Sequence, residues 1–207
     1  AAPMSTGLGE APEVALPWDD GWFEGDPAQY NHDLTIAAMV LSGSAYAGRG
    51  AGVREGLQRL GFRAVQSFNY QICDQPDGGR AAYAFARRDL PGACLVAVVV
   101  RGTGEVTEWA GNLNVGTGRD HAGFAQAGDE LLENLEKYLA QEPDRPLRFL
   151  VTGHSRGGEM VATAYLLNGY DRYPENGAIA FDYNYNIRSI IALAPTVNQY
   201  MPADHSV

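Results

Sequence analysis

The spacing of apolar residues along the chain changes from a helical period to that of strands. After an opening stretch rich in proline, glycine and acidic residues, apolar side chains recur every three or four positions. They predict a helix over residues 33–46, with Asn31 as its N-cap. A shorter helix follows and stops at Gly61, a residue type common at helix ends. Its inward-facing residues are Val53, Leu57 and Leu60.

The next segments have the pattern of β-strands. Residues 65–70 and 82–86 are predicted strands, and turn-forming residues separate them. An amphipathic helix begins near Phe124, and a later helix is closed by Gly169. The strand predicted at 95–100 is apolar on both faces, which is typical of the centre of a sheet. Two further predicted strands, 147–152 and 189–194, are mostly apolar.

This order of elements predicts an α/β fold. Hairpin-like strands come first and strand–helix–strand units follow, which favours a mixed, mostly parallel sheet with helices on both faces, in three layers. The three apolar strands should run parallel at its centre, with the hairpin-like strands to one side. One domain over residues 1–207 is expected, with 1–30 as an irregular arm held down by its aromatic side chains.

Composition narrows the classes of function. The 15 basic and 25 acidic side chains give a formal net charge of −10, which argues against a nucleic-acid partner because such surfaces need clustered Lys and Arg. No apolar run approaches the ~20 residues of a membrane span. The cysteines, Cys73 and Cys94, are either separate thiols or one disulfide that needs an oxidising compartment. The four histidines lack ligand spacing, so no metal site is predicted.

One motif carries chemistry. Residues 153–157 have the pattern G-x-S-x-G and lie between a predicted buried strand and a predicted helix. In that context the pattern is a nucleophile elbow: a strained turn lifts the serine oxygen to the carboxyl edge of the sheet, and the glycines avoid collision with the neighbouring strand and helix. Ser155 is therefore the predicted nucleophile. The alternative is a glycine-rich loop that binds an anion at a helix start.

Four ordered motifs resemble the class 3 lipase family over roughly residues 18–170. They are a strand end at 101–103, the tryptophan Trp109, a helix start at 121–124 and the elbow itself. The resemblance implies a fold of the α/β-hydrolase type. It also implies a serine hydrolase of the lipase or esterase type, which cleaves a small-molecule or lipid carboxylic ester and needs no cofactor.

The resemblance further implies an oxyanion hole and a lid. The backbone N–H groups of Thr103 and Arg156 would donate to the oxyanion that develops during acyl transfer, with the Thr103 hydroxyl assisting. The loop from Gly104 to Gly111 would be a lid that contacts the lipid interface, with glycines at both ends as hinges. Trp109 would either line the acyl site or fill the core.

The triad acid and base are harder to assign. Only His205 among the histidines follows Ser155, so it is the predicted base, with Asp182 or Asp171 as the orienting acid. The resembled family carries these groups on further strands and loops, whereas only 207 − 195 = 12 residues follow Pro195.

Three accounts of this atypical, shortened C-terminus stay open. The acid and base lie on a missing segment or a second chain, or His205 reaches back to complete the triad. In the third account the chain is a non-catalytic relative that binds an acyl ligand with an incomplete triad. The N-terminus lacks the features of a signal peptide, so the chain is either a mature secreted protein or a cytoplasmic one; an extracellular location is the expectation.

Overall fold

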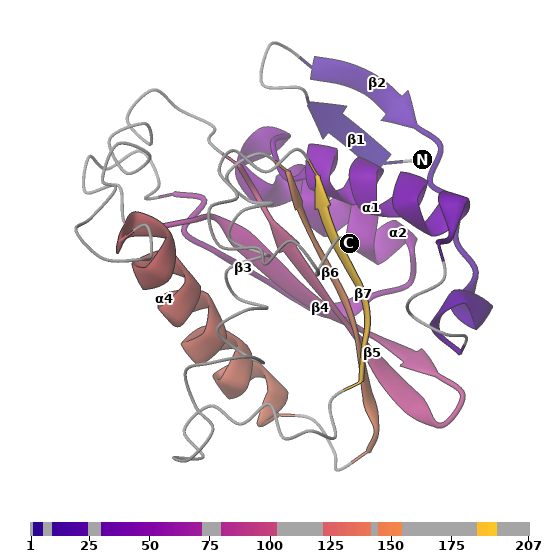
Figure 1. Ribbon diagram of the computed structural model, residues 1–207. Helices are drawn as coiled ribbons and strands as arrows, with labels where there is room; N and C mark the ends of the chain where they lie inside the picture. Colours follow the sequence, from indigo (N-terminus) through magenta and orange to yellow (C-terminus); the bar gives the residue numbers. More distant parts are fainter. Residues whose placement is uncertain are drawn as a thin grey trace.

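One mixed sheet organises the described part of the chain (Figure 1). The computed structural model describes residues 2–5, 10–24, 30–71, 80–102, 122–141, 145–154 and 186–193. The five strands of the sheet lie in the order β3–β4–β5–β6–β7. Their bounds are β3 Arg63–Phe68, β4 Tyr83–Leu90, β5 Ala93–Val100, β6 Leu147–His154 and β7 Asn186–Leu193.

Helices cover both faces of this sheet. The helices α1 (His32–Ser44) and α2 (Ala51–Arg59) cover one face, and α4 (Ala122–Leu139) covers the other. The side chain of Asn31 accepts a hydrogen bond of 3.0 Å from the Leu34 N–H, which confirms the predicted N-cap of α1. Gly61 follows α2 in a left-handed conformation with φ +78°, so the predicted end of this helix is also confirmed.

The prediction of a mostly parallel sheet of the α/β-hydrolase type is wrong. β3 pairs antiparallel with β4, and β4 pairs antiparallel with β5, whereas β5–β6 and β6–β7 are parallel. The physical reason lies in the connections. Pro91 and Gly92 join β4 to β5, with Gly92 at φ +71°, and so short a turn permits antiparallel pairing alone. Residues 101–146 are long enough for the crossover that the parallel β5–β6 pair requires.

Two apolar cores form, one on each face of the sheet. β5 lies in the middle of the strand order and every one of its residues is buried, because its side chains point alternately into both cores. Toward α1 and α2 the central strands present small side chains, which leave room for α1: Ala84, Ala86 and Ala97. Toward α4 they present bulky rings, which fill the space under that helix: Tyr83, Phe85 and Phe149.

The N-terminal arm is more ordered than predicted. Its first residues are not irregular, because β1 (Ala2–Ser5) pairs antiparallel with β2 (Glu10–Val14). This small sheet contacts α1 and α2 through β1. Proline, glycine and acidic residues have low strand propensity, and pairing between neighbouring segments overrides that preference here.

Aromatic side chains fasten the second half of the arm, as predicted. Phe23, in the 3₁₀ helix η1 (Asp20–Phe23), is fully buried, and the ring of Trp18 lies 5.3 Å from that of Phe62. The Asp20 carboxylate accepts hydrogen bonds of 2.7 and 2.9 Å from Arg88 on β4. These bonds hold the pKa of Asp20 below its ordinary value. The arm is thus tied to the body by both apolar burial and charge.

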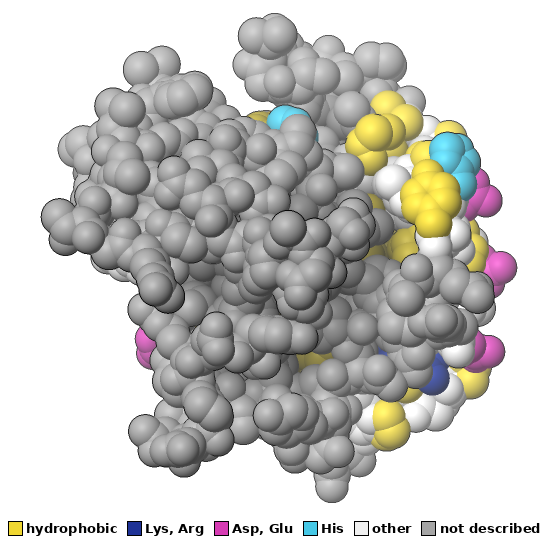
Figure 2. Space-filling model, viewed as in Figure 1, with side chains coloured by type: hydrophobic (Ala, Val, Ile, Leu, Met, Phe, Trp, Pro, Cys, Tyr) yellow, Lys and Arg dark blue, Asp and Glu magenta, His cyan; other side chains and the backbone are white. Residues whose placement is uncertain are grey.

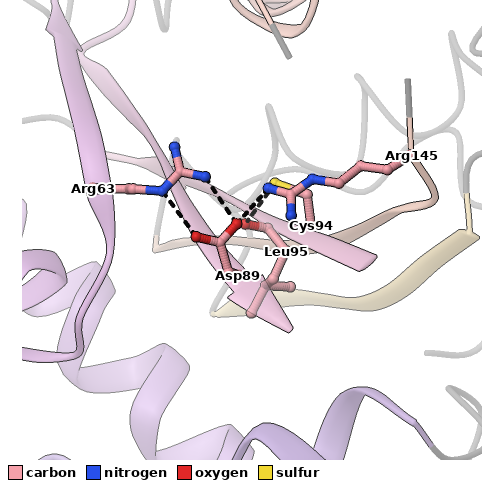
Figure 3. A network of polar contacts seen from close by, with 5 residues as sticks. All are labelled: Arg63, Asp89, Cys94, Leu95 and Arg145. Atoms are coloured by element: carbon pink, nitrogen blue, oxygen red, sulfur yellow. Dashed lines mark hydrogen bonds and ion pairs between the residues drawn. The ribbon is translucent and has the colours of Figure 1, made fainter. Parts of the chain in front are cut away.

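A surface ion-pair network joins three segments at the far end of β4 (Figure 3). Asp89 accepts hydrogen bonds of 3.1 and 2.8 Å from Arg63 on β3 and a further one from Arg145, which precedes β6. The two guanidinium groups lower the pKa of Asp89 to about 2. The carboxylate is more than half exposed, so solvent screens the pairs and their stabilising effect is modest.

Acid should weaken the fold through Asp89. The pKa of an aspartate in an unfolded chain is ~3.9. Since the folded value is about 2, the stabilisation is complete above the unfolded pKa and is lost as the pH falls from ~4 to ~2. We expect Asp89→Asn to lower the free energy of unfolding by about 1 kcal/mol or less at pH 6. The difference between parent and variant should shrink toward zero at pH 2, and urea unfolding at both pH values measures it. A difference that stays constant with pH would contradict this role.

Candidate active site

The candidate site lies where the parallel strands end. In the parallel pairs, Val100 of β5 lies opposite Gly153 of β6, and His154 of β6 lies opposite Leu193 of β7. The segments that follow these three strands therefore all leave the sheet at its carboxyl edge. In open α/β sheets this edge, beside parallel strands, is where ligands bind.

The predicted site residues lie outside the described residues: Ser155, Thr103, Arg156, His205 and Asp182. The lid from Gly104 to Gly111, Trp109 and Asp171 also lie outside them. The structure describes their chain neighbours instead. His154 is the last residue of β6 and immediately precedes the predicted nucleophile, and Gly102, two residues after β5, precedes Thr103. His154 and Gly102 both lie at the carboxyl edge of the sheet. Asn186, four residues after Asp182, begins β7 at the amino edge.

A buried pair of hydroxyls connects α1 to β6 beneath this edge. Ser42 Oγ lies 2.9 Å from Thr152 Oγ1, and both residues are buried. The Thr152 hydroxyl is also 3.5 Å from the carbonyl oxygen of Ala38, one turn earlier in α1. Buried hydroxyls are costly unless they are hydrogen-bonded, so this pair specifies which turn of α1 lies over which residue of β6.

A tyrosine and a histidine extend this connection to the end of β6. The hydroxyl of Tyr46, two residues after α1, lies 3.1 Å from His154 Nδ1. Their ring centroids are 5.9 Å apart with an interplanar angle of 73°, an edge-to-face contact. His154 is exposed, and the contact holds its ring on the α1 side of the sheet. The exposed residue before the predicted nucleophile is thus held by the segment that follows α1.

The end of β5 is fixed by different means. Arg101 is 8% exposed, and its backbone N–H donates a hydrogen bond of 2.8 Å to the Ala82 carbonyl oxygen next to β4. Its guanidinium lies over the buried ring of Tyr70, 5.4 Å from the ring centroid, in a cation–π contact. The chain therefore reaches Gly102 and the predicted oxyanion-hole residue from an anchored position.

Sequence reasoning did not find Tyr46, Ser42 or the clamp that they form. The available signal was weak: Ser42 and Tyr46 are four residues apart at the end of a helix, and Thr152 and His154 are two apart on a strand. Each spacing puts two side chains on one face, but nothing in the chain says that these faces meet. In the sequence His154 is a variable position of the G-x-S-x-G motif, and nothing there indicates Tyr46 as its partner.

Two histidine–tyrosine contacts lie on the α1 side of the sheet, one near each end of α1. The described histidines are His32 and His154, and each lies against a tyrosine. Figure 2 shows histidine side chains beside hydrophobic ones on this side. Tyr30, the partner of His32, is 77% exposed and lies at the beginning of α1, far along the helix from Tyr46.

The described residues add little on cofactors or membranes. Among them no three His, Cys, Asp or Glu side chains gather in a way that could hold a metal ion. No helix in the described ranges is long and apolar enough to cross a bilayer. Cys94 is buried on β5, and Cys73 lies outside the described residues. In comparisons with known proteins, no family model and no curated protein matches this sequence.

Proposed function

We propose that this protein is a serine hydrolase that cleaves carboxylic esters through an acyl intermediate on Ser155. One observation carries the proposal: β6, a largely buried strand, ends at Gly153 and His154, so the G-x-S-x-G motif starts where the strand stops. A nucleophile elbow requires a strand that ends at this point of the motif. The alternative, a glycine-rich loop that binds an anion at a helix start, can also follow a strand, so the reactivity of the serine decides between the two.

The register of the parallel strands supports the assignment of the oxyanion hole. Adjacent strands are ~4.8 Å apart, and Val100 lies opposite Gly153, so the chain enters the Thr103 and Ser155 segments from neighbouring points. Donation from the backbone N–H groups of Thr103 and Arg156 to one oxygen needs these segments to start close together. In the proposed reaction both groups stabilise the negative charge of the tetrahedral intermediate.

The reaction follows the scheme of acyl transfer to serine. The Ser155 oxygen attacks the ester carbonyl carbon while a base removes its proton, and the C–O bond to the alcohol then breaks as the alcohol takes that proton. Water attacks the acyl-serine in the same way and releases the acid. The proposed base is His205. No cofactor is needed, and the substrate class is a short acyl ester or a lipid ester.

The orienting acid has two candidates, Asp182 and Asp171. Asn186 lies opposite Arg148 near the amino end of β6, and Leu193 is seven positions further along β7. That length of strand is ~23 Å, whereas the four residues from Asp182 to Asn186 span at most ~14 Å. Even fully extended back along the sheet, those four residues stop ~9 Å short of the carboxyl edge, which disfavours Asp182. Asp171 is under no such limit.

A fluorophosphonate probe tests the proposal directly. The folded parent protein should be labelled at Ser155, as identified by mass spectrometry of the labelled peptide, because an activated serine displaces fluoride from the probe. If His205 is the base, His205→Ala should lower the labelling rate by about 10²-fold or more. Labelling of the variant at the parent's rate would indicate a base from another segment or chain. A folded parent that is never labelled would contradict the hydrolase and favour a binder of acyl ligands.

A further inference from the structure

We infer that Tyr46 is a positioning residue for Ser155, acting through His154. This inference rests on the proposed function, since it concerns how the nucleophile is held. In this account Tyr46 acts indirectly. It holds the ring of the residue that is joined to Ser155 by a peptide bond, which keeps the two Cα atoms ~3.8 Å apart.

The end of α1 and the end of β6 cover similar distances between their two contacts. From Ser42 to Tyr46 a helix rises ~6 Å, and from Thr152 to His154 a strand rises ~6.6 Å. The Ser42–Thr152 contact of 2.9 Å and the Tyr46–His154 contact of 3.1 Å therefore form in register along both elements. The first contact is buried and sets the register, and the second extends it to the last residue of β6.

Tyr46 is itself well held at the end of α1. Its backbone N–H donates a hydrogen bond of 3.2 Å to the Gly43 carbonyl oxygen, and the adjoining Ala45 keeps a helical conformation and is fully buried. Its ring is half-buried, whereas the ring of His154 is exposed. The tyrosine is thus the fixed partner, and it restrains a strand end that would otherwise fray.

The direction of this hydrogen bond is linked to the tautomer of the imidazole. When the Tyr46 hydroxyl donates to Nδ1, the neutral His154 ring carries its proton on Nε2. The ring is then fixed in both orientation and tautomer. Positioning of this kind affects the rate strongly, because a displacement of ~1 Å at a reacting group can cost ~10²-fold.

The chain contains a matched control at the other end of α1. Tyr30 and His32 form a similar exposed pair, with the hydroxyl 3.0 Å from Nδ1 and the ring centroids 6.3 Å apart. This pair lies within one short segment rather than between a helix and β6. Tyr30→Phe removes the same kind of hydrogen bond without touching the end of β6.

The experiment compares Tyr46→Phe with Tyr30→Phe and the parent. We expect Tyr46→Phe to lower the rate of Ser155 labelling and kcat for a short-chain ester by about 5- to 10-fold, consistent with one lost hydrogen bond, with KM unchanged. Tyr30→Phe should behave as the parent. His154→Asn, whose side-chain oxygen replaces Nδ1 as acceptor, should retain more activity than His154→Ala. Adding His154→Ala to Tyr46→Phe should cause little further loss.

Nitrogen NMR of the imidazoles separates positioning from a general loss of stability. In the parent, His154 should show the Nε2–H tautomer, and Tyr46→Phe should shift it toward a mixture while the urea midpoint changes little. If the parent is labelled but Tyr46→Phe shows unchanged kinetics and an unchanged tautomer, the inference is wrong and the proposed hydrolase activity is unaffected. A parent that is never labelled would overturn both.

Discussion

Replacing Ser155 with alanine should abolish turnover of a chromogenic short-chain ester, lowering kcat by on the order of 10⁴- to 10⁶-fold. Alanine has no oxygen to attack the carbonyl carbon, so no acyl intermediate forms. Residual activity above the uncatalysed rate would come from the oxyanion hole, which the substitution leaves in place. The initial rate of ester hydrolysis measures the effect. Circular dichroism and the urea midpoint should match those of the parent.

A second serine provides the control for this loss. Ser67 is exposed on β3, two strands away from β5, and accepts a hydrogen bond of 3.0 Å from Arg54. Ser67→Ala should keep the parent's rate. If Ser155→Ala and Ser67→Ala hydrolyse the ester equally fast, the proposed mechanism is wrong.

Replacing Tyr138 with alanine should lower the free energy of unfolding by about 3–5 kcal/mol, the range for truncation of a large buried aromatic ring. The ring is 1% exposed, lies 5.5 Å from that of Phe85, and covers the buried guanidinium of Arg87 at 4.3 Å. Its hydroxyl donates a hydrogen bond of 2.9 Å to the Ala64 carbonyl oxygen, which ties α4 to β3. Truncation therefore leaves a cavity in the core and also removes a cation–π contact and a hydrogen bond. Urea unfolding at neutral pH measures the loss.

The comparison with Tyr138→Phe separates the ring from the hydroxyl. Phenylalanine keeps the ring in the core beside Arg87 and loses only the hydrogen bond to the carbonyl oxygen of Ala64, an exposed residue. We expect a loss of about 1 kcal/mol for this variant. Similar losses for the two variants would mean that the ring contributes little and that the packing of α4 against the sheet depends on other side chains.

The proposed nucleophile and its support belong to different parts of the fold. The elbow depends on a strand that ends at the right residue, and that end is held from one side by α1 and from the other by the register with β5 and β7. Sheet order and helix docking together decide where His154 lies. A substitution in α1 is therefore expected to reach the site, although α1 contains none of its proposed catalytic groups.

Local signals in the sequence predicted most of the individual elements. Asn31 caps α1, Gly61 follows α2 in a left-handed conformation, and the fully apolar run of β5 lies in the centre of the sheet. These features depend on interactions within a few residues, or on burial that a strand shows as a run of apolar side chains. The candidate nucleophile was found in the same way, from five consecutive residues.

The direction of the strands and the support of the site depended on tertiary structure. The short Pro91–Gly92 turn made β4 antiparallel to β5, and the arm paired with itself as β1 and β2 against the propensity of its residues. The Ser42–Thr152 and Tyr46–His154 contacts join residues 110 and 108 positions apart. No local pattern encodes such contacts, because they form only when the apolar face of α1 is buried against β5 and β6. The sequence by itself determined most of the helices and strands and indicated the candidate nucleophile, whereas packing decided what holds the end of β6 in place.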